Sequence, residues 1–357
     1  MKNLEKYYNV LKAEQLDALL VSSQISRMYC AEYDIAEGLA VVSPKGSRYF
    51  TDSRYIEAAQ NNLPDFTVVE VNAENSYEKL LQQTIDDYGI VTLGFEEEFM
   101  TVAEFSRFDQ ALSAKLVPCQ QALNVLRAVK EPWELERMKK AQEITDQAFT
   151  EVLTKIRVGM TEKELTAELI YCLYKNGADG LSFQPIVVSG PNTSMPHGVP
   201  GERKLRSGDF ITMDFGCLYH GYCSDMTRTV ALGHATEEMK KVYGIVLEAQ
   251  LAGIAATKAG VTGQTIDGAA RKVIRDAGYG AYFGHGYGHS LGLEIHESPN
   301  CNTRNDKPMP LGAVASAEPG IYLPGKFGVR IEDVVIFTED GCIDIAKSEK
   351  SLIVLPV

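Results

Sequence analysis

Two acidic segments of this sequence place carboxylates at spacings suited to binding a cation. The first runs from 211 to 230, where apolar and β-branched residues on both sides of a turn predict a β-hairpin. With the turn centred between Tyr219 and His220, Asp214 is expected directly across from Asp225. Cross-strand partners have Cβ atoms about 4.5–5.5 Å apart, and two like charges at that spacing repel unless they share a proton or bind a cation.

The second acidic segment, 317–337, repeats this arrangement. Pro324-Gly325 is typical of a turn, and a hairpin folded about Gly325 brings Glu318 opposite Glu332. Glu332 stands in an apolar run, where an unpaired carboxylate is costly to bury. The segment therefore predicts a second pair of facing carboxylates.

A glycine-rich segment, 283–299, contains three histidines: His285, His289 and His296. The first two are four residues apart, which on a helix would suggest a zinc pair. Four glycines between 284 and 292 argue against a helix, since each glycine inside a helix lowers its stability by about 1 kcal/mol relative to alanine. The better interpretation is an extended segment whose glycines permit a close approach, and the density of histidines indicates a site.

These three segments together have the composition of a metal centre. Four carboxylates carry about four negative charges, which two divalent cations would balance while one imidazole stays neutral. A single divalent ion would leave two negative charges uncompensated. Oxygen-rich ligation favours Mn²⁺, with Co²⁺ and Zn²⁺ as the alternatives.

The composition of the whole chain excludes several classes of protein. Its 357 residues are 45% hydrophobic and 23% charged, which is ordinary for a globular protein with two domains. A formal charge of -13 argues against a nucleic-acid partner, because phosphate binding needs clustered Lys and Arg. We expect neither a signal peptide nor a membrane span, because no apolar run has the necessary length. Seven scattered cysteines without a CxxC pair predict free, buried thiols and a cytoplasmic location.

The elements that must position these residues fall into two parts. Alternating helical and extended patterns predict an α/β N-terminal domain, and a polar stretch containing Pro132 marks its boundary. Beyond it, Met138-Lys-Lys recurs at Met239, an offset of 101 residues, and the same helix, Gly-x-Thr, helix, Gly punctuation recurs without a gap. Thr161 and Thr262 stand at the N-cap positions of the two copies. The duplication predicts a pseudo-twofold α+β domain with a cleft between its halves.

At these residues the sequence resembles the creatinase/methionine aminopeptidase-fold ("pita-bread") metallopeptidases of family M24, most closely the Xaa-Pro aminopeptidase and Xaa-Pro dipeptidase branch. The resemblance covers nearly the whole chain and implies a creatinase-like α/β domain at 1–124 and a pita-bread catalytic domain at 125–357. Asp52-Ser-Arg-Tyr55 and the strand at Leu19–Ser23 carry it in the first domain, and Leu126-Arg-x-x-Lys130 carries it at the junction. The implied metal ligands are Asp214, Asp225, His289, Glu318 and Glu332. The surrounding positions that also match are His197, His285, His296 and Arg330.

This resemblance implies that the protein is a metal-dependent exopeptidase. It would hydrolyse the bond between an N-terminal residue and proline in a small peptide, through a hydroxide that bridges two metal ions. Glu318 would pass a proton from water to the leaving prolyl nitrogen, besides ligating a metal. His197 and His296 would contact the substrate and the developing oxyanion.

Two further residues are expected to orient the site rather than to do chemistry. These are His285 and Arg330, and Arg330 is expected to hold Asp225 or Glu332. The resemblance also implies a homodimer in which the N-terminal domain shields the cleft of the partner subunit.

The activity within this branch stays open at the level of sequence. A dipeptidase must recognise the free carboxylate of the proline residue, and no single residue in the sequence identifies a binding group for it. A broader aminopeptidase that prefers N-terminal Met is the alternative enzyme. A metal-free binding protein on the same fold is the other alternative, and it is disfavoured because all five implied ligands are present.

Overall fold

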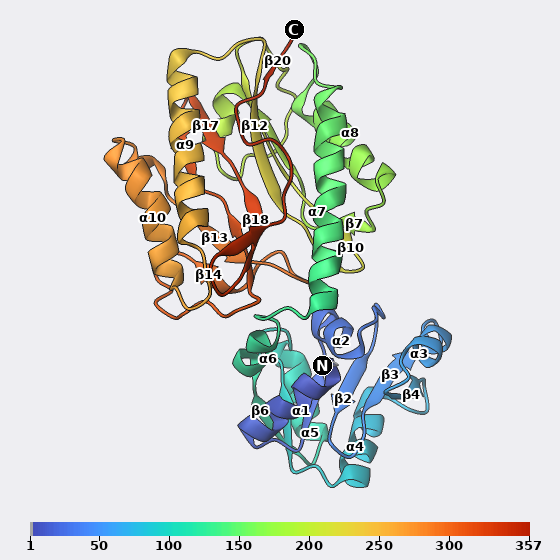
Figure 1. The fold of residues 1–357 in the computed structure, drawn as a ribbon. Coiled ribbons are helices and arrows are strands. Elements are labelled where there is room, and N and C mark those ends of the chain that lie inside the picture. Colours follow the sequence, from blue (N-terminus) through green and yellow to red (C-terminus); the bar gives the residue numbers. More distant parts are fainter. Residues whose placement is uncertain (1–2) are drawn as a thin grey trace. The chain divides into compact units, whose positions relative to one another are not determined.

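Residues 3–357 are described by a computed structural model (Figure 1). The chain forms two compact units, which divide between Leu126 and Arg127. Within the described range, no helix is long and apolar enough to cross a membrane. All seven cysteines are free and six of them are buried, as their scattered spacing predicts.

The N-terminal unit contains a six-stranded mixed sheet and is an α/β unit, as predicted. Its strands are β1 (Ala18–Val21), β2 (Leu39–Val42), β3 (Arg48–Asp52), β4 (Thr67–Val71), β5 (Thr92–Phe95) and β6 (Lys115–Pro118). Its helices are α1 (Asn3–Glu14), α2 (Gln24–Ala31), α3 (Ile56–Asn62), α4 (Tyr77–Tyr88), α5 (Val102–Ala111) and α6 (Gln120–Leu126). The strand order is β4-β3-β2-β1-β5-β6, and the apolar run of β1 is buried at every position because β1 lies inside the sheet.

The helices of the C-terminal unit confirm the predicted repeat. They are α7 (Pro132–Leu153) and α8 (Glu162–Lys175) in the first copy, and α9 (Glu237–Ala256) and α10 (Gly263–Asp276) in the second. Both α8 and α10 have 14 residues, and 101 positions separate their first residues. Thr161 and Thr262 cap these two helices, each accepting a hydrogen bond from the amide three residues later.

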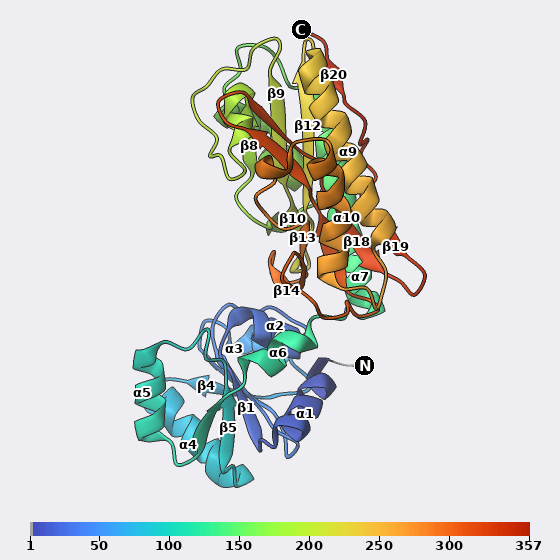
Figure 2. The same ribbon diagram turned by 90° about the vertical axis from the view of Figure 1, so that its left-hand side faces the viewer.

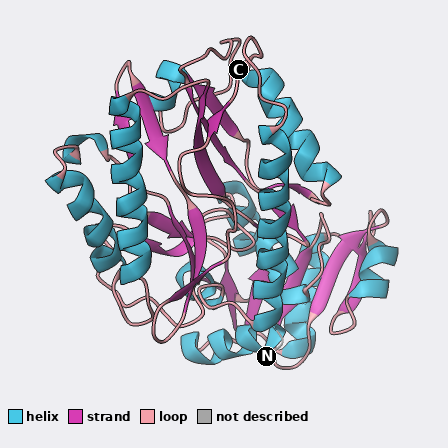
Figure 3. Cartoon of the chain, turned by 45° about the horizontal axis from the view of Figure 1, so that its top comes forward, coloured by secondary structure: helices cyan, strands magenta, loops and turns pink. Residues whose placement is uncertain are grey.

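Each half also contains a sheet, and a hydrophobic core packs mainly within each half. The strand orders are β20-β12-β9-β8 in the first half and β14-β13-β15-β18-β19 in the second. The first-half strands are β8 (Ile186–Ser189), β9 (Phe210–Phe215) and β12 (Met226–Leu232), joined by the C-terminal β20 (Val354–Leu355). The second-half strands are β13 (Gly288–Ser290), β14 (Glu297–Cys301), β15 (Val314–Ala317), β18 (Asp333–Phe337) and β19 (Cys342–Asp344). In Figure 2, the helices α7, α9 and α10 lie on one side of the first-half strands β8, β9 and β12, and helices flank the strands in Figure 3.

Short elements complete the C-terminal unit. They are β7 (Gly180–Leu181), β10 (Cys217–Tyr219), β11 (Tyr222–Cys223), β16 (Gly320–Leu323), β17 (Phe327–Arg330) and the 3₁₀ turns η1 (Gly190–Ser194) and η2 (Gly280–Tyr282). β7, β10 and β11 form a three-stranded sheet, and β16 pairs with β17.

The first acidic segment is a hairpin, but its predicted register is wrong. Asp214 pairs with Thr227 rather than with Asp225. His220 and Gly221 have φ of 45° and 81°, so the two-residue turn is centred one residue later than expected. Moving the turn centre by one residue moves every cross-strand partner by two, which leaves Asp214 and Asp225 diagonal to each other.

The second acidic segment has the predicted register. Gly320 pairs with Arg330, and Ala317 pairs with Asp333 in the same register. Glu318 and Glu332 are therefore opposite each other between these pairs. Gly325 has φ of 75° in the turn, a conformation that glycine adopts without a steric penalty.

The glycine-rich segment is extended at His289, as predicted. His289 is the middle residue of β13, which lies between β14 and β15. A Cβ atom on Gly288 would lie 1.9 Å from the carbonyl oxygen of Ser316, so only glycine fits at this position. The glycine brings the strand of His289 against the strand that leads to Glu318.

Candidate metal centre

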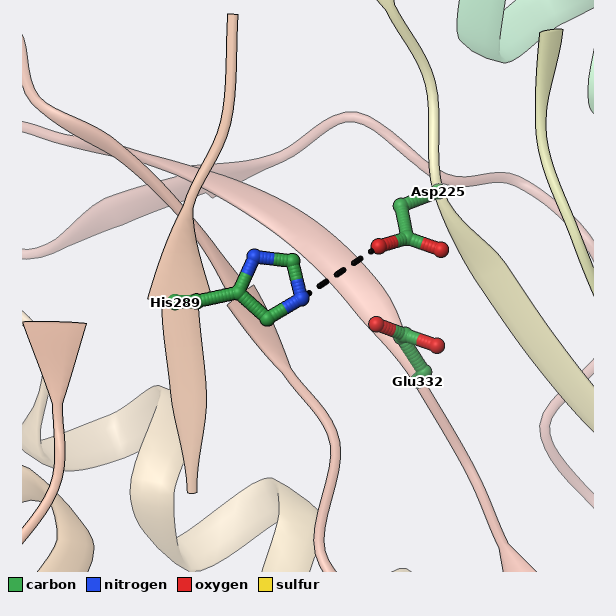
Figure 4. Close-up of side chains that lie close together, drawn as sticks. All are labelled: Asp225, His289 and Glu332. Atoms are coloured by element: carbon green, nitrogen blue, oxygen red, sulfur yellow. Dashed lines mark ion pairs between the residues drawn. The ribbon is translucent and has the colours of Figure 1, made fainter. Parts of the chain in front are cut away.

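Within the described residues, one group has three potential metal ligands close together. Asp225, His289 and Glu332 each offer one donor atom, and these atoms lie within 4.8 Å of one another (Figure 4). Asp225 and Glu332 are 3% and 2% exposed, so both carboxylates lie in the interior. Asp225 precedes β12 in the first half, whereas Glu332 precedes β18 in the second. The group is therefore shared by the two halves of the duplication.

The other two predicted ligands lie beside this group. Glu318 Oε1 is 3.4 Å from His289 Nε2, and Asp225 Oδ2 is 3.5 Å from the same nitrogen. Asp214 lies close enough for its charge to raise the pKa of Asp225. The structure therefore brings all five predicted ligands together, with Asp214 and Glu318 less buried than the inner pair.

His289 presents a neutral imidazole to these carboxylates. Burial lowers its pKa below the ordinary value, so the ring is uncharged at neutral pH and its close contacts are not ion pairs there. Nδ1 is 3.2 Å from the carbonyl oxygen of Ser290, which fixes the proton on Nδ1 and leaves the Nε2 lone pair facing Asp225 and Glu318. Donor atoms separated by 3.4 to 3.5 Å fit a shared ion, because nitrogen and oxygen ligands lie about 2.0–2.2 Å from zinc-sized metals.

The inner carboxylates carry charge that the surrounding residues do not fully compensate. Burial raises the pKa of Asp225 well above its usual range, and the charges of Asp214 and Glu318 raise it further. Burial and the charge of Asp225 also raise the pKa of Glu332. Asp225 Oδ1 is buried and has no hydrogen-bond partner among the described residues. A bare, buried carboxylate oxygen beside three other carboxylates fits a divalent cation, which would supply the missing positive charge.

Arg330 holds Asp214, not Asp225 or Glu332 as the sequence analysis expected. Its Nη2 is 2.5 Å from Asp214 Oδ2. The reason is the register of the first hairpin: Asp214 is paired with Thr227, and Arg330 Nε donates to Thr227 Oγ1, so the guanidinium lies over that pair. Thr227 Oγ1 in turn donates to Glu332 Oε2 at 2.6 Å. Thr227, which the sequence analysis did not identify, thus connects carboxylates of the two halves.

His285 is joined to the site by a tyrosine that the sequence analysis also missed. His285 Nδ1 is 2.8 Å from the carbonyl oxygen of Gly286, so Nε2 accepts a hydrogen bond from the Tyr322 hydroxyl at 2.9 Å. The same hydroxyl accepts a bond from Arg330 Nη1 at 3.0 Å. Burial raises the pKa of Tyr322 to about 12, so it stays protonated. In the sequence, the alternation of side chains along a strand was the pattern that could have pointed to Tyr322, because it places Tyr322 on the same face of β16 as Gly320.

His296 and His197 occupy the exposed side of the site. The ring centroids of His289 and His296 are 4.4 Å apart in an edge-to-face arrangement. Burial lowers the pKa of His296, and charge on His289 or on His197 lowers it further, so His296 is a neighbour of both. All nine residues named from the sequence therefore gather in one region of the C-terminal unit.

The segment that carries His296 is anchored by the junction motif. Lys130 Nζ is 3.0 Å from Glu297 Oε2, and both side chains are almost fully buried. Glu297 Oε1 also accepts hydrogen bonds from the amides of Leu293 and Glu294. Lys130, the last residue of the Leu-Arg-x-x-Lys motif, therefore contacts the chain directly beside His296.

Four buried or half-buried carboxylates around a neutral imidazole, on a duplicated α+β scaffold, are typical of metal-dependent hydrolases. Comparison with known proteins narrows this class. Residues 136–339 match metallopeptidase family M24, and residues 3–129 match the creatinase/prolidase N-terminal domain. The chain belongs to metallopeptidase family M24. It is therefore a hydrolase, and its family implies divalent metal ions.

Similar proteins match over almost the full chain. An Xaa-Pro dipeptidase from Bacillus anthracis superposes with a TM-score of 0.96 at 39% identity, covering 99% of each chain. An X-Pro aminopeptidase from Thermotoga maritima superposes with a TM-score of 0.92 at 39% identity, covering 97% of this chain and 99% of that one. An Xaa-Pro dipeptidase from Pyrococcus furiosus is 32% identical over 99% of both chains. These likenesses confirm the creatinase-type N-terminal and pita-bread C-terminal folds.

Proposed function

We propose that this protein is an exopeptidase that cleaves the bond between an N-terminal residue and proline. The observation that carries the proposal is the convergence of Asp214, Asp225, His289, Glu318 and Glu332, with Asp225 Oδ1 bare and buried. The similarity of the whole chain to Xaa-Pro dipeptidases and to an X-Pro aminopeptidase supports the choice of bond. We assign the chemistry to the domain at 125–357 and treat 1–124 as the creatinase-like domain.

These five residues would hold two divalent ions, for which we propose Mn²⁺ because four of the five ligands are carboxylates. When bound, the ions supply a water nucleophile at neutral pH and polarise the scissile carbonyl. His289 offers Nε2 because Nδ1 is engaged by Ser290. Arg330 holds Asp214 in place through an ion pair, and Thr227 orients Glu332 through its hydroxyl.

Glu318 is the group we assign to proton transfer. Burial raises its pKa above the usual carboxyl value, which brings it closer to the pH at which a general base and acid works best. It accepts a hydrogen bond from Ser316 Oγ at 3.1 Å, and it has no arginine contact of the kind that holds Asp214. Glu318 would accept a proton from water and return it to the prolyl nitrogen as the peptide bond breaks.

His197 and His296 are the residues we assign to the substrate. Both are exposed, and His296 is a neighbour of the half-buried ligand His289 and of His197. Their imidazole N–H groups would donate to the substrate and to the oxyanion of the tetrahedral intermediate, where one donor contributes about 10²–10³-fold to turnover.

Cleavage of three peptides tests the proposal directly. Purified protein with added Mn²⁺ should hydrolyse Ala-Pro, Ala-Pro-Ala or both, and it should hydrolyse Met-Ala much more slowly. Ala-Pro alone would identify a dipeptidase, and Ala-Pro-Ala would identify an aminopeptidase. Preference for Met-Ala would replace the proposal with a broader aminopeptidase, and failure to cleave any of the three would end it.

Two finer proposals rest on the resemblance to the family and on the cysteines. We propose a homodimer in which the N-terminal domain shields the partner's cleft, which light scattering at micromolar concentration tests, since a monomeric mass would contradict it. We also propose a cytoplasmic location, because all seven cysteines are free. Fractionation of the source cells tests this, and recovery outside the cytoplasm would contradict it.

A further inference from the structure

The loop that carries His197 is closed at both ends by one buried carboxylate. Glu162, the first residue of α8, is 0% exposed. Its Oε1 accepts hydrogen bonds from the amide of Ser189 at 2.8 Å, from Ser189 Oγ at 2.8 Å and from Asn192 Nδ2 at 3.1 Å. Its Oε2 accepts a bond from the amide of Gly201 at 3.0 Å. Ser189 and Gly201 are the two ends of the segment that contains His197, so Glu162 ties them to the same point.

The middle of this loop is attached to the candidate metal centre. Arg330 Nη1 donates to the carbonyl oxygen of Pro196 at 3.2 Å, while its Nη2 holds Asp214. The amide of Gly328 donates to Thr193 Oγ1 at 2.8 Å. His197 itself is exposed, so its position is set by these attachments of its backbone rather than by burial of its ring.

The second copy of the repeat shows that the fold does not itself need this glutamate. The residue 101 positions after Glu162 is Gly263, which also begins its helix. A Cβ atom on Gly263 would lie 2.3 Å from the carbonyl oxygen of Asn300, so the backbone at Asn300 packs directly against the start of this helix. The same junction of helix and loop therefore forms in the second copy without a side chain, whereas the loop of His197 in the first copy is bound to a carboxylate.

We propose that Glu162 is a positioning residue for substrate binding: by closing residues 189–201 at both ends, it sets the place of His197 relative to Arg330 and Asp214. This inference rests on the proposed function. A group that contacts the substrate must be held within about 0.5 Å of its productive position, and an error of about 1 Å can cost about 10²-fold in rate. An exposed histidine on a loop reaches that precision only if its backbone is fixed, which the four hydrogen bonds to Glu162 achieve.

The first test is Glu162→Gln, which keeps the size of the side chain but replaces one acceptor oxygen by a donor. The amide cannot accept at both ends of the loop, so either Gly201 or Ser189 loses its partner. We expect kcat/KM for the Xaa-Pro peptide that the wild type cleaves to fall about 10- to 100-fold, with Mn²⁺ content unchanged. The matched control is Glu164→Gln in the same helical turn, where glutamine also completes the capping box with Thr161, and its kcat/KM should stay within about twofold.

A double-mutant cycle separates positioning from general loss of stability. If Glu162 acts through His197, then Glu162→Gln should have little further effect in a His197→Ala background. Fully additive losses, or wild-type kinetics in folded Glu162→Gln, would overturn the proposal. Should Glu162→Gln fail to fold, Asn192→Ala removes one donor and leaves the buried carboxylate intact. It should lower kcat/KM about 3- to 10-fold, with the same dependence on His197, and an unchanged kcat/KM would equally overturn the proposal.

Hydrogen–deuterium exchange gives a readout that does not depend on activity. In Glu162→Gln, or in Asn192→Ala if the first variant does not fold, peptides covering 189–201 should exchange faster while β9 (Phe210–Phe215) keeps its protection. Unchanged exchange in 189–201 would refute the loop closure. Failure of the wild type to cleave any Xaa-Pro peptide would refute the proposed function instead, and the exchange result would still decide whether Glu162 holds the loop.

Discussion

In the first half of the C-terminal unit, Asp225 is followed by Met226, whose sulfur accepts a hydrogen bond from Gln142 of α7 at 3.7 Å. In the second half, Glu332 is followed by Asp333, whose Oδ2 accepts a bond from Gln250 of α9 at 2.6 Å. In both halves a buried glutamine of the long helix donates to the residue after the ligand, although Gln142 and Gln250 are 108 residues apart and so are not equivalent positions of the 101-residue repeat. The two arrangements differ in charge, because a buried methionine in one half stands where a buried aspartate stands in the other.

The buried aspartate is compensated by residues from outside its own strand. Arg228 of β12 lies 2.7 Å from Asp333 Oδ1, and Lys350 lies 2.6 Å from Oδ2. Arg228 also donates to the carbonyl oxygen of Glu332 at 2.6 Å. The two halves therefore differ in the electrostatics behind their inner ligands: a buried ion network braces the backbone of Glu332, and the residue after Asp225 is an apolar methionine.

The largest expected effect is on stability. Arg228→Met should lower the free energy of unfolding of the metal-free protein by about 3–5 kcal/mol, because it leaves Asp333 buried without its main partner. Met226→Leu, the matched change in the other half, conserves volume and should cost less than about 1.5 kcal/mol. Urea denaturation in the presence of a chelator measures both. Equal losses would mean that the ion network does not distinguish the halves.

The next effect concerns Glu318, the carboxylate assigned to proton transfer. Glu318→Gln should lower kcat by about 10²-fold or more and retain at least one metal ion, because glutamine keeps an acceptor oxygen but cannot exchange a proton. Glu98→Gln, at an exposed position of the N-terminal unit, should change kcat by less than about twofold. Near-normal turnover of Glu318→Gln with its metal content verified would contradict the proton-transfer role. Loss of all metal would assign Glu318 to metal retention alone, and the shuttle would have no support.

A smaller effect tests the link between the halves. Thr227→Val removes the hydroxyl that donates to Glu332 and accepts from Arg330, and Mn²⁺ binding should weaken about 10- to 100-fold. Thr212→Val is the control, because Thr212 is buried in the same sheet and its hydroxyl bonds to Thr229 instead of to a predicted ligand. Titration calorimetry measures both affinities. Equal affinities in the two variants would show that the Thr227 hydroxyl does not orient the site.

Much of the fold and site follows from local patterns in the sequence. The 101-residue repeat was visible because both copies keep their N-cap threonines and their glycines after the second helix. The register of the second hairpin was predicted correctly because Pro324-Gly325 allows the turn to be placed at one position only. The identity of the ligand set came from a resemblance. Of the two facing carboxylate pairs that the patterns predict, Glu318 and Glu332 face each other, whereas Asp214 and Asp225 are diagonal.

What the sequence did not predict depends on single residues with more than one reasonable conformation. The first hairpin was placed in the wrong register because His220 adopts a positive φ beside Gly221, which a non-glycine residue seldom does. That shift brings Thr227 across from Asp214 and so decides which carboxylate Arg330 binds. Glu162 went unnoticed because its partners are amides 27 and 39 residues away, and no local pattern marks a backbone donor.

The most direct test of the central claim is the metal content of the active protein. Elemental analysis of protein dialysed from Mn²⁺ should give about two ions per chain, matching four carboxylate charges. Chelation should abolish hydrolysis of Xaa-Pro peptides, and Mn²⁺ should restore it. Asp225→Asn, which removes the inner charge of the first half, should bind fewer ions under the same conditions. Full activity after exhaustive chelation, with no metal detected, would contradict the account.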